Sequence, residues 1–182
     1  MVLRGVAICL AAAALALTFW LSLGAQPEKA VFADLPPLTG PVILTVTGDF
    51  DRIAGGEMAF DLAMLQALGS ASFSTSSIWT DGVHRFTGVS LYRLAAYLGI
   101  PQGAMLKCAA INDYVVDVPV GDAVDGGPII AYAMDDAPMS VRGKGPLWLL
   151  YPFDQNPAYR SEVIYTRSIW QLDRIDVVAA AD

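Results

Sequence analysis

Three consecutive residues, Asn112, Asp113 and Tyr114, combine the side chains needed to recognise a planar heterocycle. A carboxylate accepts paired hydrogen bonds from the amino-pyrimidine edge of such a ring, and an aromatic side chain can cover its face. Trp79 and Trp148 stand close to polar turns and add two large aromatic groups. An Asn-Asp pair is equally typical of a simple turn, and tryptophans are common in protein cores, so both interpretations stay open.

A basic, glycine-rich stretch opens the segment VRGKGPLWLLYPFD further along the chain. Arg142 and Lys144 alternate there with Gly143 and Gly145, immediately before a strongly apolar run. Small residues let the backbone come close to a ligand, and the two cations supply a positive field. The stretch can therefore hold an anionic or electron-rich ligand, although a solvated turn explains the same composition.

The motifs of the best-known catalytic classes are absent from the chain. It has no Gly-x-Ser-x-Gly sequence, no dinucleotide fingerprint and no phosphate-binding P-loop. Chance easily supplies a trio of Ser74, Asp81 and the single histidine, His84, which is better explained as a structural residue. We therefore assign no catalytic residue.

Cysteine content and charge exclude further classes. Cys9 lies in an N-terminal apolar segment, and Cys108 lies in the apolar stretch AMLKCAAI, which predicts a buried, inert thiol. Without a cluster of cysteines and histidines, we expect no zinc site of the usual ligand set. The net charge of −7 argues against nucleic acid as a partner.

The first 25 residues have the layout of a secretory signal peptide. Arg4 is followed by an apolar run to Leu21 and then by small residues up to Ala25, where we expect cleavage. The protein is then exported to the periplasm; the alternative is an uncleaved membrane anchor, because the run is nearly long enough to span a bilayer. Residues 26–40 contain three prolines without periodicity, which predicts a linker over 26–41 and one domain over 42–182.

Within that domain, short strands alternate with a few short helices. The tripeptide TDG is expected to close a first hairpin, and MDDAPM a second. This order predicts an α+β, mostly β single domain rather than a parallel doubly wound sheet. Helices are expected over residues 61–69, 90–99 and 158–171, and strands over 41–48, 70–79, 83–89, 105–111, 114–120, 128–134, 145–152 and 173–178.

Several segments, taken in order, resemble the molybdopterin-binding domain of the sulfite oxidase family. They are IWTDGVHRFTGVSLYRLAAYLGI, AAINDYVVDVPVGDA, PIIAYAMDDAPMSVRGKGPLWLLYPFD and SIWQLDRIDV. The resemblance covers about residues 42–178 and implies the mixed α+β fold of that family. The positions that match its motifs are Gly88, Val89 and Leu91, then Asn112 through Pro119, and finally Gly145, Pro146 and Leu147.

The chain departs from that family at the metal ligand. The enzymes supply a cysteine thiolate to molybdenum upstream of a Trp-Gly-Val segment, whereas SFSTSSIWTDG offers only hydroxyls there, which are poor substitutes for a soft thiolate. Cys108 lies on a different expected strand, so the ligand role is not carried onto it. Trp148 stands where the enzymes have an arginine after Gly-Pro-Leu.

With the pterin pocket that the family implies and no cysteine ligand for molybdenum, the chain is most similar to small exported proteins of this fold that bind free reduced pterins. Members of that group dock onto the periplasmic domain of an inner-membrane diguanylate cyclase or phosphodiesterase and alter its cyclic-di-GMP activity. The resemblance then implies a pterin pocket in which Tyr114 and Trp148 stack and Asp113→Ala abolishes binding. The full set of expected pocket residues is Trp79, Asn112, Asp113, Tyr114, Arg142, Lys144 and Trp148.

Two other functions stay open at this point. The chain can be a subunit of a molybdopterin-dependent oxidoreductase, with an unconventional ligand or Cys108 recruited to molybdenum. It can also be an adaptor domain whose pocket has lost its ligand. Retained molybdenum would distinguish the enzyme from both other functions.

Overall fold

The computed structural model describes residues 34–52 and 56–180. The expected signal peptide and the first part of the expected linker lie outside these ranges. The last linker residues are tied to the domain, because the N–H groups of Thr39 and Gly40 both donate to the Asp61 carboxylate. Within the described ranges, no helix combines the length and apolar character needed to cross a bilayer.

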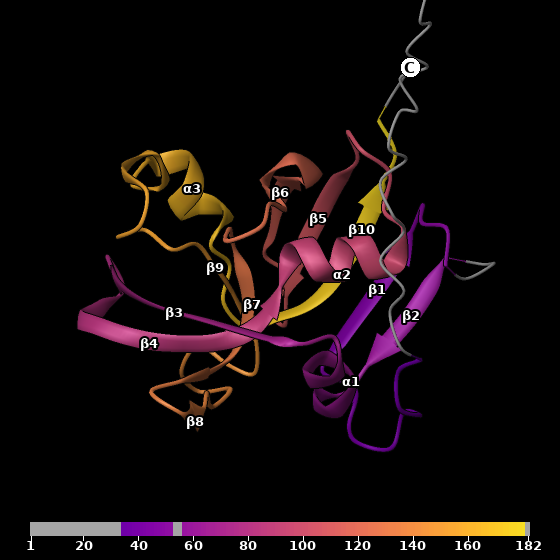
Figure 1. The fold of residues 1–182 in the computed structure, drawn as a ribbon, viewed down its shortest axis with the longest axis horizontal. Coiled ribbons are helices and arrows are strands. Elements are labelled where there is room, and N and C mark those ends of the chain that lie inside the picture. Colours follow the sequence, from indigo (N-terminus) through magenta and orange to yellow (C-terminus); the bar gives the residue numbers. More distant parts are fainter. Residues whose placement is uncertain (1–33, 53–55, 181–182) are drawn as a thin grey trace, which may run out of the picture.

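The first sheet contains five strands in the order β2-β1-β10-β5-β6. Only β1 and β10 run parallel, and the other neighbours are antiparallel. Side chains alternate across β1, where Leu44 and Val46 are fully buried, so one face of the sheet packs on the core. The strands are β1 (Leu44–Gly48), β2 (Glu57–Phe60), β5 (Met105–Ala110), β6 (Val115–Pro119) and β10 (Leu172–Val178) (Figure 1).

The second sheet is built on two hairpins. Its order is β3-β4-β7-β8, and β9 also pairs with β7. The two-residue turn of Asp135 and Asp136, both with positive φ, joins β7 to β8 as the sequence predicted. The strands are β3 (Ser70–Ser77), β4 (Thr80–Ser90), β7 (Ile129–Met134), β8 (Ala137–Pro138) and β9 (Trp148–Leu150).

The first hairpin turns two residues earlier than expected. Ser77 pairs with Thr80, so Ile78 and Trp79 form the turn, and the prediction that TDG closes this hairpin was wrong. Ser76 then pairs with Val83, which leaves Asp81 and Gly82 as extra residues in a bulge. As a result, Trp79 stands at the tip of the hairpin and not inside a strand.

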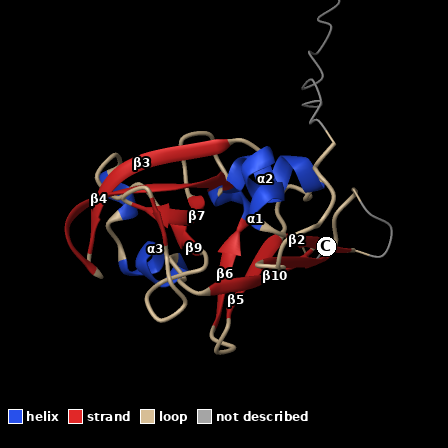
Figure 2. Cartoon of the chain, turned by 90° about the horizontal axis from the view of Figure 1, so that it is seen from below, coloured by secondary structure: helices blue, strands red, loops and turns tan. Residues whose placement is uncertain are grey.

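Three short α-helices complete the part of the domain that the structure describes: α1 (Leu62–Ala67), α2 (Leu91–Leu98) and α3 (Glu162–Arg167). Asp61 caps α1 by accepting the N–H of Met64, and Gly99 ends α2 in the left-handed conformation; both were predicted. The expected helix over 158–171 is much shorter, because the chain after Arg167 pairs with β9 instead. In Figure 2, α1 and α2 lie near the first sheet, whereas α3 lies at the other end of the domain.

Candidate functional site

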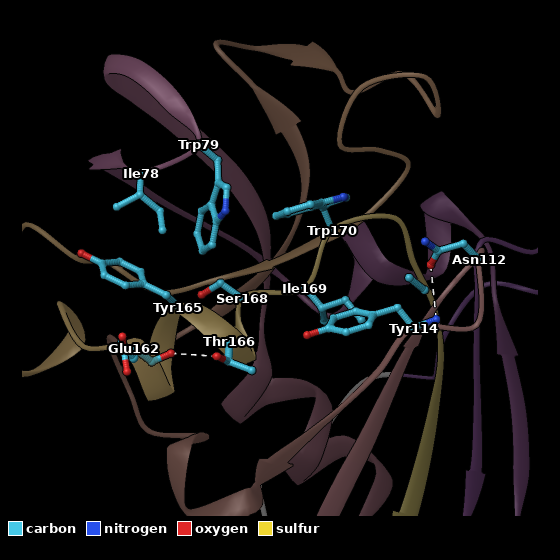
Figure 3. Close-up of a pocket in the computed structure, with 11 residues that line it drawn as sticks. Ile78, Trp79, Asn112, Tyr114, Glu162, Tyr165, Thr166, Ser168, Ile169 and Trp170 are labelled. Atoms are coloured by element: carbon cyan, nitrogen blue, oxygen red, sulfur yellow. Dashed lines mark hydrogen bonds between the residues drawn. The ribbon is translucent and has the colours of Figure 1, made fainter.

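A cavity of about 630 Å³ lies where three separate parts of the chain meet. The tip of the β3–β4 hairpin forms one wall, the β5–β6 corner forms a second, and α3 with the residues after it forms the third (Figure 3). Its apolar and aromatic lining is Ile78, Trp79, Ala110, Tyr114, Tyr165, Ile169 and Trp170, and its polar lining is Asn112, Glu162, Thr166 and Ser168. Such a mixture of aromatic surface and a few polar groups is typical of small-molecule sites.

Trp79 is the centre of the aromatic wall. Its ring centroid lies 5.6 Å from that of Trp170, 5.7 Å from that of Tyr165 and 5.9 Å from that of Trp148, all with edge-to-face geometry. Trp148 itself is fully buried and donates its indole N–H to the Ser168 carbonyl oxygen at 3.2 Å. Trp148 therefore supports the aromatic wall from the core and does not line the cavity, whereas Trp79 does.

The segment after α3 is held by β9. The Leu149 N–H donates to the Ile169 carbonyl oxygen at 2.9 Å, and Trp148 and Trp170 form an isolated bridge. These bonds bring Ile169 and Trp170 to the cavity and explain why α3 ends at Arg167. Trp170 was not among the pocket residues expected from sequence, although an aromatic residue just before the last strand was a usable signal.

The β5–β6 corner divides the Asn-Asp-Tyr triplet. Asn112 and Tyr114 line the cavity, and the Asn112 side-chain oxygen accepts the Tyr114 N–H at 3.3 Å. Asp113 has a positive φ of 63°, and its side chain, 84% exposed, accepts a hydrogen bond from Arg174 at 2.5 Å. Asp113 is not among the lining residues, so its carboxylate serves an ion pair at the surface and not the cavity.

The carboxylate in the cavity belongs to Glu162, which no sequence signal had singled out. Glu162 is the first residue of α3, and its main-chain carbonyl accepts the Thr166 hydroxyl at 2.9 Å (Figure 3). Its exposed carboxylate forms no ion pair or hydrogen bond with the residues that the structure describes. This group is available to accept hydrogen bonds from a ligand.

The basic glycine-rich stretch forms a tight loop. The N–H groups of Gly143 and Gly145 both donate to the Ser140 carbonyl oxygen, at 3.0 and 2.9 Å. A Cβ atom on Gly145 would lie 1.9 Å from the Met139 carbonyl oxygen, so only glycine fits there. This close packing explains Gly145 without any ligand, as the alternative of a simple turn had suggested.

Lys144 and Arg142 have different environments in this loop. The Lys144 ammonium nitrogen lies 4.3 Å from the Trp170 ring centroid and 5.1 Å from that of Trp148, and partial burial lowers the pKa of its ammonium group. Lys144 lines a second hollow, of about 540 Å³, which shares Trp79 with the first. Arg142 is exposed and lines neither hollow.

His84 is held by two acceptors. Its Nδ1 lies 2.6 Å from the Asp135 carboxylate, and its Nε2 lies 2.9 Å from the Asp81 main-chain oxygen. The hydrogen bond to Asp135 raises the pKa of the imidazole. No hydrogen bond links His84 to Ser74 in the described part of the chain, and this geometry fits the structural role expected from sequence.

Comparison with known proteins gives a fold but no family. No sequence-family model matches the chain, and no curated protein sequence matches it. The fold is similar to the crystal structure of the sulfane dehydrogenase SoxCD from Paracoccus pantotrophus, with a TM-score of 0.56 and 15% sequence identity. The likeness covers 74% of this chain and 37% of that chain. The expected fold class is confirmed. It is a mixed, mostly β domain with two sheets, and it resembles the fold of SoxCD.

The donors in the cavity do not fit the molybdenum cofactor that this fold implies. Cys108 is fully buried on β5 and does not line the cavity, and desolvation raises the pKa of its thiol to about 12. Strand β3 presents only hydroxyl groups beside the hairpin tip, and the described residues contain no group of three His, Cys, Asp or Glu side chains that could hold a metal ion. A soft metal therefore finds no thiolate at this site.

Proposed function

We propose that this chain binds a free reduced pterin in the aromatic cavity and acts without catalysing a reaction. One observation carries the proposal: a cavity of about 630 Å³ combines two tryptophan rings with hydrogen-bonding side chains and contains no thiolate. A heterocycle held by stacking and by hydrogen bonds needs these groups, and it needs no metal ligand.

The polar groups of the cavity suit the edge of a pterin. The 2-amino-4-oxo pyrimidine half of a pterin presents adjacent N–H donors and one carbonyl acceptor. The unpaired carboxylate of Glu162 can accept two N–H groups, and the Asn112 amide can donate to a carbonyl oxygen. Trp79 and Trp170 offer aromatic surface for the ring. The pyrimidine-edge role that sequence reasoning placed on Asp113 thus passes to Glu162 in this proposal.

Calorimetry with a reduced pterin tests the proposal directly. We expect 6-methyltetrahydropterin, titrated anaerobically into the purified protein, to bind at one site per chain. Trp170→Ala should weaken binding about 5- to 150-fold, since stacking of a heterocycle on an aromatic side chain contributes roughly 1–3 kcal/mol. Tyr92→Ala is the control, because Tyr92 is an exposed aromatic residue on α2 that does not line the cavity. Absence of binding, or equal loss in both variants, would contradict the proposal.

A molybdopterin-dependent oxidoreductase is the second candidate, and the likeness in fold to a sulfane dehydrogenase favours it. Elemental analysis and mass spectrometry of the small molecules released from protein exported to the periplasm of a pterin-producing host separate the two. Stoichiometric molybdenum would establish the enzyme and make Cys108 the first residue to replace. A metal-free pterin would support the binding protein.

We also propose that the loaded protein is exported and regulates a membrane-bound cyclic-di-GMP enzyme through the periplasmic domain of that enzyme. The sequence layout of residues 1–25 supports export, and the exposed apolar side chains at the cavity support a ligand-sensitive contact surface. Ile78 is 64% exposed and Tyr114 54% exposed, and both line the cavity. Deletion of the gene should change cyclic-di-GMP levels only in cells that make pterins. An Ile78→Asp variant that still binds pterin should reproduce this change.

A further inference from the structure

The second hollow lies beside the first and differs from it in the charges of its lining residues. The two share Trp79, and the 540 Å³ hollow extends from there along the glycine-rich loop to Met139, Ser140 and Lys144. Its ionisable lining consists of Lys144, His84 and Asp81, whereas Glu162 is the charged side chain among the described residues that line the first cavity. A ligand that fills the first cavity and extends past Trp79 would therefore meet cations.

Lys144 has no carboxylate partner in the described part of the chain. Its contacts are the faces of Trp170 and Trp148, which attract the ammonium but leave its N–H donors unused. The position is fixed through the backbone, because the Gln171 N–H donates to the Lys144 carbonyl oxygen at 3.0 Å. Arg52, Arg93 and Arg142 also have no carboxylate partner among the described residues, but none of them lines this hollow. The remaining described cations pair with aspartates: Arg85, Lys107, Arg160, Arg167 and Arg174.

His84 does not compete for an anion in this hollow. Both of its ring nitrogens face acceptors, the Asp135 carboxylate and the Asp81 main-chain oxygen, so the doubly protonated ring donates to both. Its donors are used, and the charge of Asp135 balances its own. Lys144 is left as the group that offers free donors and an unbalanced positive charge.

We propose that Lys144 binds a carboxylate on a side chain that the ligand carries past Trp79 into the second hollow. This inference rests on the proposed pterin function, and it narrows the ligand to pterins with a singly charged, carboxylate-bearing substituent. A carboxylate suits the site better than a phosphate, because one ammonium faces the hollow and the Asp81 side chain adds negative charge there.

Titration of matched pterins tests this assignment. We expect the wild-type protein to bind pterin-6-carboxylate about tenfold more tightly than unsubstituted pterin, as one hydrogen bond between charged groups provides. Lys144→Gln should remove this preference, and Lys144→Arg should keep it. Arg142→Gln is the control: it removes the same charge from the same loop outside both hollows and should leave the preference within about twofold.

The outcomes test the carboxylate subsite, its single charge and the pterin function separately. Equal wild-type affinity for the two compounds, or a preference that survives in Lys144→Gln, overturns the carboxylate subsite while leaving the pterin cavity intact. Tighter binding of 6-hydroxymethylpterin phosphate than of the carboxylate overturns the assignment of a single charge. If 6-methyltetrahydropterin binds wild-type protein but pterin-6-carboxylate does not, the carboxylate subsite fails. If none of these pterins binds wild-type protein, the proposed function itself fails. The comparison of ligands on wild-type protein needs no variant to fold.

Discussion

Replacing Glu162 by glutamine removes the negative charge from the candidate cavity and preserves the shape of the side chain. Glu162 is the single carboxylate among the lining residues, and it has no ion-pair partner in the described ranges. If it accepts the amino-pyrimidine edge of a pterin, Glu162→Gln exchanges one of two acceptor oxygens for an NH2 group that faces a ligand donor. Affinity should fall, and the fold should be unaffected.

The size of the effect follows from the environment of Glu162. A hydrogen bond to a charged group contributes about 1.5–3 kcal/mol, and the lower end applies because the residue is exposed in the free protein. A loss of about 1.4 kcal/mol of binding free energy corresponds to a tenfold larger dissociation constant. We therefore expect Glu162→Gln to weaken binding of 6-methyltetrahydropterin at least about tenfold, with an unchanged urea midpoint.

Asp113→Asn is the matched control, because it makes the same chemical change at the carboxylate that the sequence had favoured. Asp113 is 84% exposed and pairs with Arg174 outside the cavity. Breaking such a surface pair costs less than about 1 kcal/mol of stability and should leave pterin affinity within about twofold. Calorimetry on both variants measures the contrast. A large loss in Asp113→Asn together with wild-type affinity in Glu162→Gln would refute this reasoning about the cavity.

Three further predictions concern charge and burial away from that carboxylate. The pKa of His84 is raised by Asp135, so the stability that the pair contributes is fully present below the ordinary value of 6.5 and is lost as the pH rises through the raised value. Urea unfolding should then show wild-type and His84→Gln proteins differing most in mildly acid solution; a gap that widens with pH would contradict this. Cys108, whose thiol pKa is raised to about 12, should react with a disulfide reagent only after unfolding, and reaction at the unfolded rate in native protein would be evidence against its burial. Tyr151→Phe removes a 2.6 Å hydrogen bond to Asp122 and should lower the free energy of unfolding by about 1.5–3 kcal/mol, whereas a loss below about 0.5 kcal/mol would mean that the bond adds little.

Local signals in the sequence predicted most secondary-structure elements. Asp61 begins α1 because its side chain caps the helix, and Gly99 ends α2 because glycine adopts positive φ without strain. The pair Asp135 and Asp136 forms a tight hairpin turn because both residues adopt positive φ. Each of these features depends on a few neighbouring residues, so a single sequence contains the information. The length of α3 depends instead on a distant segment, because the chain that follows the helix pairs with β9.

The candidate cavity was predicted only in part, and the two tryptophans show why. Trp79 and Trp148 look alike in sequence, each next to a polar turn. In the fold, Trp79 stands at a hairpin tip and lines the cavity, whereas Trp148 lies on the short strand β9 and is fully buried. Burial depends on which distant segments pack over a side chain, and no local pattern records that.

The sequence by itself determined the class of the protein: a mostly β domain with short capped helices, a net negative charge and a first hairpin that carries hydroxyl side chains and no cysteine. Only the tertiary structure decided which side chains share a site. In the fold, Glu162 and not Asp113 is the carboxylate that lines the cavity, and Lys144 lies over the ring of Trp170. The physical reason is that capping, turns and periodicity act over a few residues, whereas this site joins the β3–β4 tip, the β5–β6 corner and α3, which meet only when the core packs.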